Sequence, residues 1–448
     1  MSALSLLSLM LISIGAFVFS KKTNFPYTVL LVILGLLLVP VSHTEFFGFI
    51  DDFKLTPDVL FYVFLPILLF ESAYNINYKE LLRNWKSIGS LAVVWLLISA
   101  VLIGGALYFI FPFFGLQIPF MVCLLFGSLI SATDPVAVLS IFKSVGAPRR
   151  LTLIFEGESI FNDGTALALF LVILGILLEG QVTPMGITSG VVSFTGMMLW
   201  GILFGLFMGV LFSKLLEKIK NDESVEIGLT ILVAHLTFIL SELIGHHLYI
   251  WDFNIKISGV IATAVAGITI WNYGRYKISP KVEETIEKYW GFFAFVSNSL
   301  VFILLGLILS DLDIHFNQFI LPIFATIGVV MIARALSVYI PIGFLNATKT
   351  EDHIPMNWQH LLSWGSLRWA LAIMMVYLIP SEPGQHGYEE LMKFQESVGW
   401  DYSFSIRDFV MVITIGSIMF TLFIKATTIS LFMRKMKIDK LHELEEFE

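Results

Sequence analysis

The stretch FEGESIFNDGTALALF, residues 155–170, places Glu158, Asn162 and Asp163 inside an otherwise mostly apolar segment. The basic pair Arg149-Arg150 stands at its leading edge. If the segment is a helix, its rise per residue puts Asp163 ~20 Å from that edge, which is near the middle of a lipid bilayer. A charge at that depth costs several kcal/mol and by default indicates a path for an ion or a proton.

The composition excludes an ordinary soluble domain. Of the 448 residues, 57 % are hydrophobic and only 14 % are charged. Apolar runs of about 20 residues, long enough to cross the hydrocarbon core, follow one another along the chain. We therefore predict an all-α integral membrane protein with 13 transmembrane helices. Their expected positions are near 2–20, 25–42, 56–75, 88–111, 118–142, 151–178, 187–213, 225–245, 256–273, 290–310, 319–345, 360–380 and 407–433.

The positive charges are unevenly divided between the loops. If the spans alternate in direction, 20 of the 27 Lys and Arg residues fall on one side, four on the other and three within spans. Because loops rich in Lys and Arg stay in the cytoplasm, the N-terminus is expected outside and the C-terminus inside. Lys21 and Lys22, directly after the first span, favour a retained anchor over a cleaved signal peptide.

The short loops predict one membrane unit over residues 1–440, followed by a short acidic cytoplasmic tail at 441–448. The longest loops are expected at 274–289, as a cytoplasmic helix, and at 381–406 on the outside. The net charge of −8 owes much to the tail and does not indicate a nucleic-acid partner. The single cysteine, Cys123, lies within a span and indicates nothing about disulfides.

Two of the spans are expected to be broken. With 13 spans, the first six and the last six can form inverted six-helix repeats around the seventh. Span five contains Pro135, which disfavours a helical conformation at Asp134. Span twelve contains Gly365 and Ser366 beside Arg368. Since these spans occupy corresponding positions of the two halves, we expect a binding site where they cross.

Asp163 is the strongest candidate for an ion ligand. Ser159 lies one helical turn earlier, so both oxygen-bearing side chains share one face, and hard cations such as sodium bind carboxylate, hydroxyl and carbonyl oxygens. The alternative is a structural Asp satisfied by an arginine. Asn162 is uncharged, which leaves one carboxylate for exchange of a proton against a monovalent cation; it could equally bridge helices by hydrogen bonds.

The break in span five offers two further candidates. Thr133 could coordinate the ion through its carbonyl or hydroxyl, and Asp134 could shape the electric field of the site. Alternatively, Asp134 only caps the broken helix. Glu71, near the inner end of span three, could approach the ion site or be structural.

A buried acid needs a partner, and the intramembrane arginines are suited to that role. We therefore expect Glu158 to pair with Arg334, which leaves Arg368 to neutralise carbonyls at the breaks and Asp134. These residues are expected to be structural or modulatory. Glu156 lies nearer the cytoplasmic edge, and it is expected to be either a gating acid or a hydrated acid without such a role.

Three polar residues within spans have plainer interpretations. His235 and Asn298 are expected to be hydrogen-bonded packing residues. Lys425, in the inner half of the last span, is expected to extend its ammonium group to the cytoplasmic surface.

Four motifs carry a family resemblance. They are SATDP at 131–135, EGESIFNDGT at 156–165, IARALSVY at 332–339 and SWGSLRWALA at 363–372. Together they resemble the first monovalent cation:proton antiporter family, which comprises NhaP-type bacterial antiporters and sodium/proton exchangers. The resemblance covers about residues 1–437, and the motif at 156–165 is highly specific.

The resemblance implies an NhaA/NhaP-like fold and a homodimer. A core (about 88–178 and 319–433) would move against a dimerisation scaffold (about 1–75 and 187–310). It also implies that Asp163 is the essential ion- and proton-binding acid, with Ser159, Thr133 and Glu71 as ion contacts. Trp369 departs from the small residue usual after the span-twelve arginine, which affects how closely spans five and twelve can approach.

The sequence therefore predicts an electroneutral antiporter of a cell membrane that exchanges Na⁺, and also Li⁺, for H⁺ by alternating access, without a cofactor. One rival keeps the fold and exchanges K⁺ for H⁺. A second is an intramembrane aspartyl protease with Asp134 and Asp163 as its dyad, although neither residue has a G-x-G-D setting. A channel is the third.

Overall fold

The computed structural model describes residues 3–23, 25–42, 59–134, 138–139, 141–142, 146–179, 183–219, 222–247, 249–250, 253–308, 316–368, 370–436 and 438. The described chain is helical apart from a two-residue antiparallel pair, β1 (Tyr249–Ile250) and β2 (Phe253–Asn254), with Tyr249 opposite Asn254. Within these residues, eight helices are long and apolar enough to cross a membrane, and three shorter apolar helices accompany them.

The helices differ widely in length, from half-spans to one of 35 residues. Their bounds are α1 Ala3–Thr23, α2 Tyr27–Ser42, α4 Leu65–Tyr74, α5 Tyr78–Arg83, α6 Trp85–Gly89, α7 Trp95–Ile110, α8 Phe120–Ser131, α10 Arg149–Leu178, α11 Pro184–Lys218, α12 Glu223–His247, α13 Gly259–Thr269, α14 Pro280–Ile308, α15 Ile320–Thr348, α16 Met356–Trp364, α17 Ala370–Tyr377, α18 Tyr388–Ser397, α19 Ile406–Phe420 and α20 Thr427–Lys435. Turns of 3-10 helix lie at Phe111–Phe114, Arg275–Lys277 and Phe316–Phe319, and π-helical turns at Leu60–Phe64, Ser90–Val94, Ile270–Gly274 and Thr421–Ala426.

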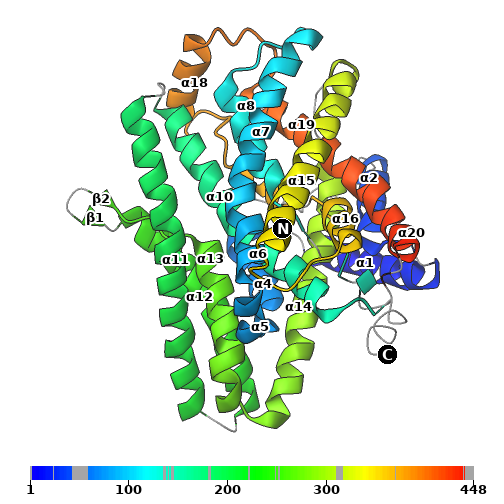
Figure 1. Cartoon of the computed structure of the whole chain (residues 1–448), viewed down its shortest axis with the longest axis vertical. Helices are drawn as coiled ribbons and strands as arrows, with labels where there is room; N and C mark the ends of the chain where they lie inside the picture. Colours follow the sequence, from blue (N-terminus) through cyan, green and yellow to red (C-terminus); the bar gives the residue numbers. More distant parts are fainter. Residues whose placement is uncertain are drawn as a thin grey trace.

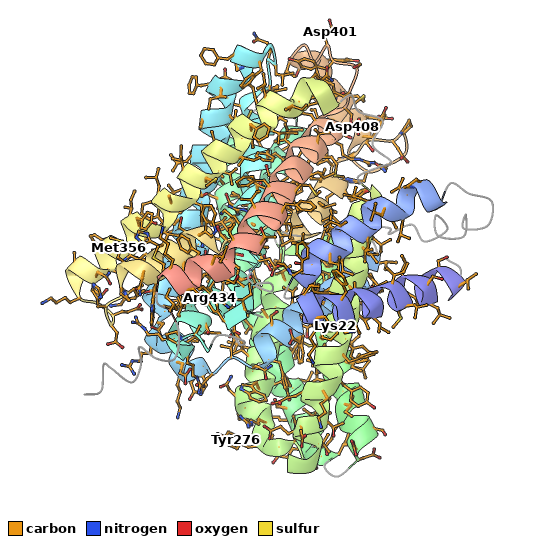
Figure 2. The ribbon with its side chains drawn as sticks, turned by 90° about the vertical axis from the view of Figure 1, so that its right-hand side faces the viewer. Lys22, Tyr276, Met356, Asp401, Asp408 and Arg434 are labelled. Carbon is orange, nitrogen blue, oxygen red and sulfur yellow. The ribbon has the colours of Figure 1, made fainter. Side chains whose placement is uncertain are left out.

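Several helices begin where the sequence offers a cap. Thr183 accepts a hydrogen bond from the Gly186 amide just before Pro184 opens α11, a favourable order because proline has no amide hydrogen to leave unpaired. Ser405 and Asp408 form a reciprocal capping box at the start of α19. Figure 2 shows Asp408 at the upper end of that helix and Arg434 near the opposite end of the α19–α20 segment.

The helices pack in two groups (Figure 1). In one group, α13 packs on α4, α11 and α12, and α14 packs on α2 and α4. In the other, α7 and α8 pack together, α15 lies on α7 and α19, and α10 lies on α8. Helix α10 also contacts α11 and α13, so it joins the two groups.

Glycines allow backbones to touch inside each group. A Cβ atom at Gly205 of α11 would clash with the carbonyl oxygen of Ala262 in α13, and one at Gly104 of α7 would lie 2.8 Å from the Cα of Leu124 in α8. Between the groups the contact is different, because Gly164 of α10 faces the side-chain end of Ile261 in α13. Small residues at such crossings are typical of membrane helices.

An apolar cluster seals one part of the boundary between the groups. Ile160 and Phe161 of α10 pack there with Ile88 of α6 and with Ile261 and Val265 of α13. This packing lies within one helical turn of Asp163 along α10, so it limits access to that residue from one direction.

The structure tests several sequence expectations. Within the described residues it has eight helices long and apolar enough to cross a membrane and three shorter apolar ones, which leaves the expected count of 13 a prediction. The expected helix at 274–289 is instead a 3-10 turn followed by the start of α14 at Pro280. The two broken spans are present: α8 ends at Ser131, and α16 and α17 are separated by the non-helical residues 365–368. Pro135, Trp369 and the tail at 441–448 lie outside the described residues.

Candidate functional site

The two broken spans cross each other through their backbones. The amide of Asp134 donates a hydrogen bond of 3.0 Å to the carbonyl oxygen of Leu367, and the two residues form an isolated antiparallel bridge. Both are buried. Spans five and twelve therefore approach each other closely, at Asp134 and Leu367. Trp369 was expected to affect this approach.

Arg368 closes the carboxyl end of α8. Its Nη1 atom donates a hydrogen bond of 2.6 Å to the carbonyl oxygen of Ala132, one residue beyond the helix. The side chain is almost fully buried. Because the last carbonyls of a helix are unpaired and carry partial negative charge, a cation at this place stabilises the interrupted helix. This is the carbonyl neutralisation expected from the sequence.

The expectation that Lys425 extends to the cytoplasmic surface is wrong, since the residue is only 4 % exposed. Its Nζ atom lies 3.3 Å from both the carbonyl oxygen and the hydroxyl of Ser366, in the break of span twelve. The signal was present in the sequence: Lys425 precedes Arg434 by nine residues, ~14 Å of helix, which is farther than a lysine side chain extends.

Helix α10 presents its polar residues to the crossing. The amide of Asn162 donates a hydrogen bond of 2.7 Å to the hydroxyl of Thr133. Asp163, next to Asn162 on the same helix, is only 5 % exposed. Among the described residues, Asp163 Oδ1 and Asn162 Oδ1 have no hydrogen-bond partner.

Unpaired buried oxygens are rare and costly, which makes this pair of atoms informative. A proton or a cation bound at Asp163 would satisfy the Asp163 oxygen. Thr133 and Ser159 are also buried, and Ser159 lies one turn before Asp163 on α10. The structure thus brings carboxylate, hydroxyl and amide oxygens from two elements to one buried region.

Glu158 and Arg334, which the sequence analysis pairs, lie in contact. Arg334 donates from Nη1 to one carboxylate oxygen of Glu158 and from Nη2 to the other, the second at 3.0 Å. Nη2 also donates to the carbonyl oxygen of Leu362, at 3.0 Å. Within the described part of the chain, Asp163 takes part in no ion pair, so the arginine-satisfied alternative for Asp163 is not supported.

The remaining candidates lie on helices rather than in the two breaks. Glu156 is half-buried on α10, and Glu71 is half-buried on α4, which packs mainly on α13 and α14. His235 hydrogen-bonds the carbonyl oxygen of Ile231, at 3.0 Å, as expected for a packing residue. For Asn298 the expectation is wrong in part, since its Oδ1 has no partner among the described residues.

Thr421 is a residue of the crossing that the sequence did not indicate. The backbone amide of Arg368 lies 3.4 Å from the hydroxyl of Thr421, a long hydrogen bond. Thr421 begins the π-helical turn Thr421–Ala426 that also holds Lys425. A threonine in an apolar span is too common to single out without coordinates.

No group of three or more His, Cys, Asp or Glu residues within the described ranges could hold a metal ion.

Comparisons with known proteins decide the class of this protein. Residues 7–435 match the family model described as "Sodium/hydrogen exchanger, transmembrane". The chain belongs to the sodium/hydrogen exchanger family. The family indicated by the motifs is thus confirmed.

Relatives of this sodium/hydrogen exchanger cover most of its length. It is 35 % identical over 353 residues to the Na⁺/H⁺ antiporter NhaP of Pseudomonas aeruginosa, covering 78 % of each chain. It is 33 % identical over 395 residues to the Na⁺/H⁺ antiporter NhaG of Bacillus atrophaeus, covering 87 % of this chain and 70 % of NhaG.

A solved structure supports the fold. The sodium proton antiporter MjNhaP1 from Methanocaldococcus jannaschii superimposes with a TM-score of 0.72 over 97 % of this chain and 98 % of that one, at 20 % identity. The exchanger is therefore an all-helical, multi-pass integral membrane protein with an NhaP1-like fold. It is a transporter and not an enzyme, which excludes the aspartyl protease alternative.

Proposed function

We propose that the chain is an electroneutral antiporter that exchanges Na⁺, and also Li⁺, for H⁺ across the plasma membrane of a cell. The observation that carries this proposal is the buried Asp163 carboxylate, one oxygen of which has no hydrogen-bond partner among the described residues. The neighbouring Asn162 is uncharged. One carboxylate that binds either one proton or one monovalent cation exchanges one charge for one charge.

Asp163, Ser159 and Thr133 are the proposed sodium ligands. The Thr133 hydroxyl accepts one hydrogen bond from Asn162, so its second lone pair and the backbone carbonyl are the oxygens that Thr133 can offer to an ion. Asp134 adds negative charge beside the site, and Glu71 of α4 is a further proposed ion contact. Hard monovalent cations favour such a mixture of carboxylate, hydroxyl and carbonyl ligands.

Charge explains why transport is coupled. The bare carboxylate of Asp163 is expensive to hold in a low-dielectric interior. Binding of either a proton or a cation neutralises it, and the neutralised site can then change the side of the membrane to which it is exposed. Because the two occupants exclude each other, movement of the site in each direction requires one of them.

For the topology we propose 13 spans with the N-terminus outside and the C-terminus inside, arranged as inverted repeats. This threading puts Tyr276 and Arg434 on the cytoplasmic side and Asp401 outside. In Figure 2, Tyr276 lies at the lower end and Asp401 at the upper end, which supports that assignment, and Arg434 lies near mid-height, below Asp408. We further propose a homodimer in which the group containing α7, α8, α10, α15 and α19 moves against a scaffold containing α11 to α14.

The test is exchange in proteoliposomes. Purified protein is reconstituted with an internal pH dye, and Na⁺, Li⁺ or K⁺ is added outside across a pH series, with and without an imposed voltage. We expect Na⁺ and Li⁺ to move protons at a rate that the voltage does not change. A rate driven by K⁺ alone would favour the K⁺/H⁺ alternative, and a voltage-driven leak without counter-ion would favour a channel.

A further inference from the structure

The last span holds a buried lysine against the break of span twelve. The Nζ atom of Lys425 lies 3.3 Å from the carbonyl oxygen and 3.3 Å from the hydroxyl of Ser366, and 5.7 Å from the centre of the Trp364 ring. Trp364 is the last residue of α16, and Ser366 follows two positions later. The ammonium group therefore lies at the carboxyl end of the first half of span twelve.

At each of the two broken spans, a basic side chain donates a hydrogen bond to a carbonyl oxygen at the end of the first half-helix. Arg368 donates to the Ala132 carbonyl at the end of α8, and Lys425 donates at the end of α16. Inside a membrane no water pairs the last carbonyls of an interrupted helix. Each interruption is thus compensated by a cation that comes from a different span.

Two residues, Leu367 and Asp134, link the Lys425 contact at Ser366 to the proposed ligand Thr133. Ser366 is followed by Leu367, whose carbonyl oxygen accepts the hydrogen bond from the Asp134 amide. Thr133, the proposed ligand, directly precedes Asp134. A displacement of Ser366 therefore displaces the bridge and, through it, the segment that carries Thr133.

The π-helical turn Thr421–Ala426 holds this arrangement from both sides. Lys425 contacts Ser366, and Thr421 of the same turn accepts the long hydrogen bond from the Arg368 amide. Leu367 lies between these two anchored residues. Single π-helical turns within α-helices are frequent at functional sites, and here the turn faces the crossing.

We propose that Lys425 is a positioning residue of the ion site: through Ser366 it fixes the bridge between Leu367 and Asp134 and thereby sets the affinity for the transported cation. This inference rests on the proposed function, because the affinity in question is that of the antiporter's cation. Lys425 itself is not assigned as a ligand.

The test compares Lys425→Met, Lys425→Arg and the control Lys435→Gln in proteoliposomes, with the cation that the wild-type protein transports. Lys435 is exposed near the end of α20. We expect Lys425→Met to raise the half-saturating cation concentration about tenfold, as for loss of a charged hydrogen bond, with a smaller change in maximal rate. Lys425→Arg should recover most of the affinity, and Lys435→Gln should match the wild type.

Folding is measured separately, by yield and by gel filtration in detergent. If Lys425→Met does not fold, Ser366→Ala and Thr421→Val take its place. The first removes the hydroxyl that contacts Lys425 and the Ser363 carbonyl oxygen, and the second removes the hydroxyl that contacts the Arg368 amide and the Ile418 carbonyl oxygen. Each keeps the volume similar, and the same rise in half-saturation, of smaller size, is expected. A folded Lys425→Met with wild-type half-saturation would overturn the role of Lys425, as would an arginine variant no better than methionine. Failure of the wild type and of Lys435→Gln to exchange any cation would instead overturn the proposed function.

Discussion

The side-chain amide of Asn162 donates a 2.7 Å hydrogen bond to the hydroxyl of Thr133. This bond joins α10, a continuous helix of 30 residues, to the extended segment that follows α8. The acid next to Asn162 is thereby held beside the break in span five. Asn162 therefore bridges two segments by a hydrogen bond, as one interpretation of the sequence proposed. This bond is compatible with a role of Asn162 beside the ion.

Asn162→Ala removes the donor of this bond. We expect the protein to lose about 1 kcal/mol of stability, the usual net value of such a bond, and to bind Na⁺ several-fold more weakly because Thr133 is no longer held. Thermal unfolding in detergent and the half-saturating Na⁺ concentration measure the two effects. Thr133→Ser, which keeps the acceptor, is the matched control, and an equal loss in both variants would contradict the explanation.

Asp163→Asn should abolish Na⁺-driven proton movement while leaving a folded protein, since an amide takes up no proton at neutral pH and has no negative charge for a proton and a cation to compete for. Exchange in proteoliposomes measures the first property, and gel filtration the second. Asp401→Asn is the control, because Asp401 is exposed at the upper end of the molecule in Figure 2. Robust exchange by the Asp163→Asn protein would remove the basis of the proposed function.

Sodium should stabilise the folded protein against heat, because a ligand that binds only the native state raises its stability. Competition sets the direction of the pH effect: protons displace Na⁺ from Asp163, so the stabilisation by Na⁺ should shrink as the pH falls. Melting curves in NaCl and in choline chloride across a pH series measure this effect. The Asp163→Asn protein should show no specific shift at any pH, whereas a shift of wild-type size there would place the sodium elsewhere.

Arg334→Met leaves the buried Glu158 carboxylate without its cation, at an expected cost of about 3–5 kcal/mol. The double variant Glu158→Leu with Arg334→Met should recover much of that loss, because it removes both charges together. Thermal unfolding of the two single variants and the double variant forms the required cycle. Additive losses would show that the two side chains do not act as a pair.

Gly205→Val should destabilise the protein by about 1–3 kcal/mol through overpacking, since its Cβ would clash with the Ala262 carbonyl oxygen, a backbone atom that cannot rotate away. Gly228→Ala in α12 is the control, because a Cβ at that position has nothing within 4 Å. The control should be neutral or slightly stabilised by its better helix propensity. Melting temperatures in detergent distinguish the two.

The parts of the site that could be predicted from the sequence are those with a local cause. Glycine and serine at 365–366 indicate the interruption of span twelve without any neighbour. The contact between Glu158 and Arg334 follows from the need of a buried acid for a cation, and few intramembrane cations are available in the chain. The family follows from the motif at 156–165.

The parts that could not be predicted depend on neighbours that are distant in sequence. Lys425 and Ser366 are 59 positions apart, and no periodicity reports which span lies beside which. The bond between the Asp134 amide and the Leu367 carbonyl joins backbone atoms, which leave no signature in the side chains. Roles in ion binding, at Asp163, Ser159, Thr133 and Glu71, stay predictions until transport is measured.

The contrast between glycine contacts has a mechanical consequence. Where Gly205 meets Ala262, backbone lies on backbone, and sliding would require two helices to separate. Where Gly164 meets Ile261, the touching atoms belong to a side chain with alternative rotamers. The contact between α11 and α13 at Gly205 is therefore stiffer than the contact between α10 and α13 at Gly164, next to Asp163.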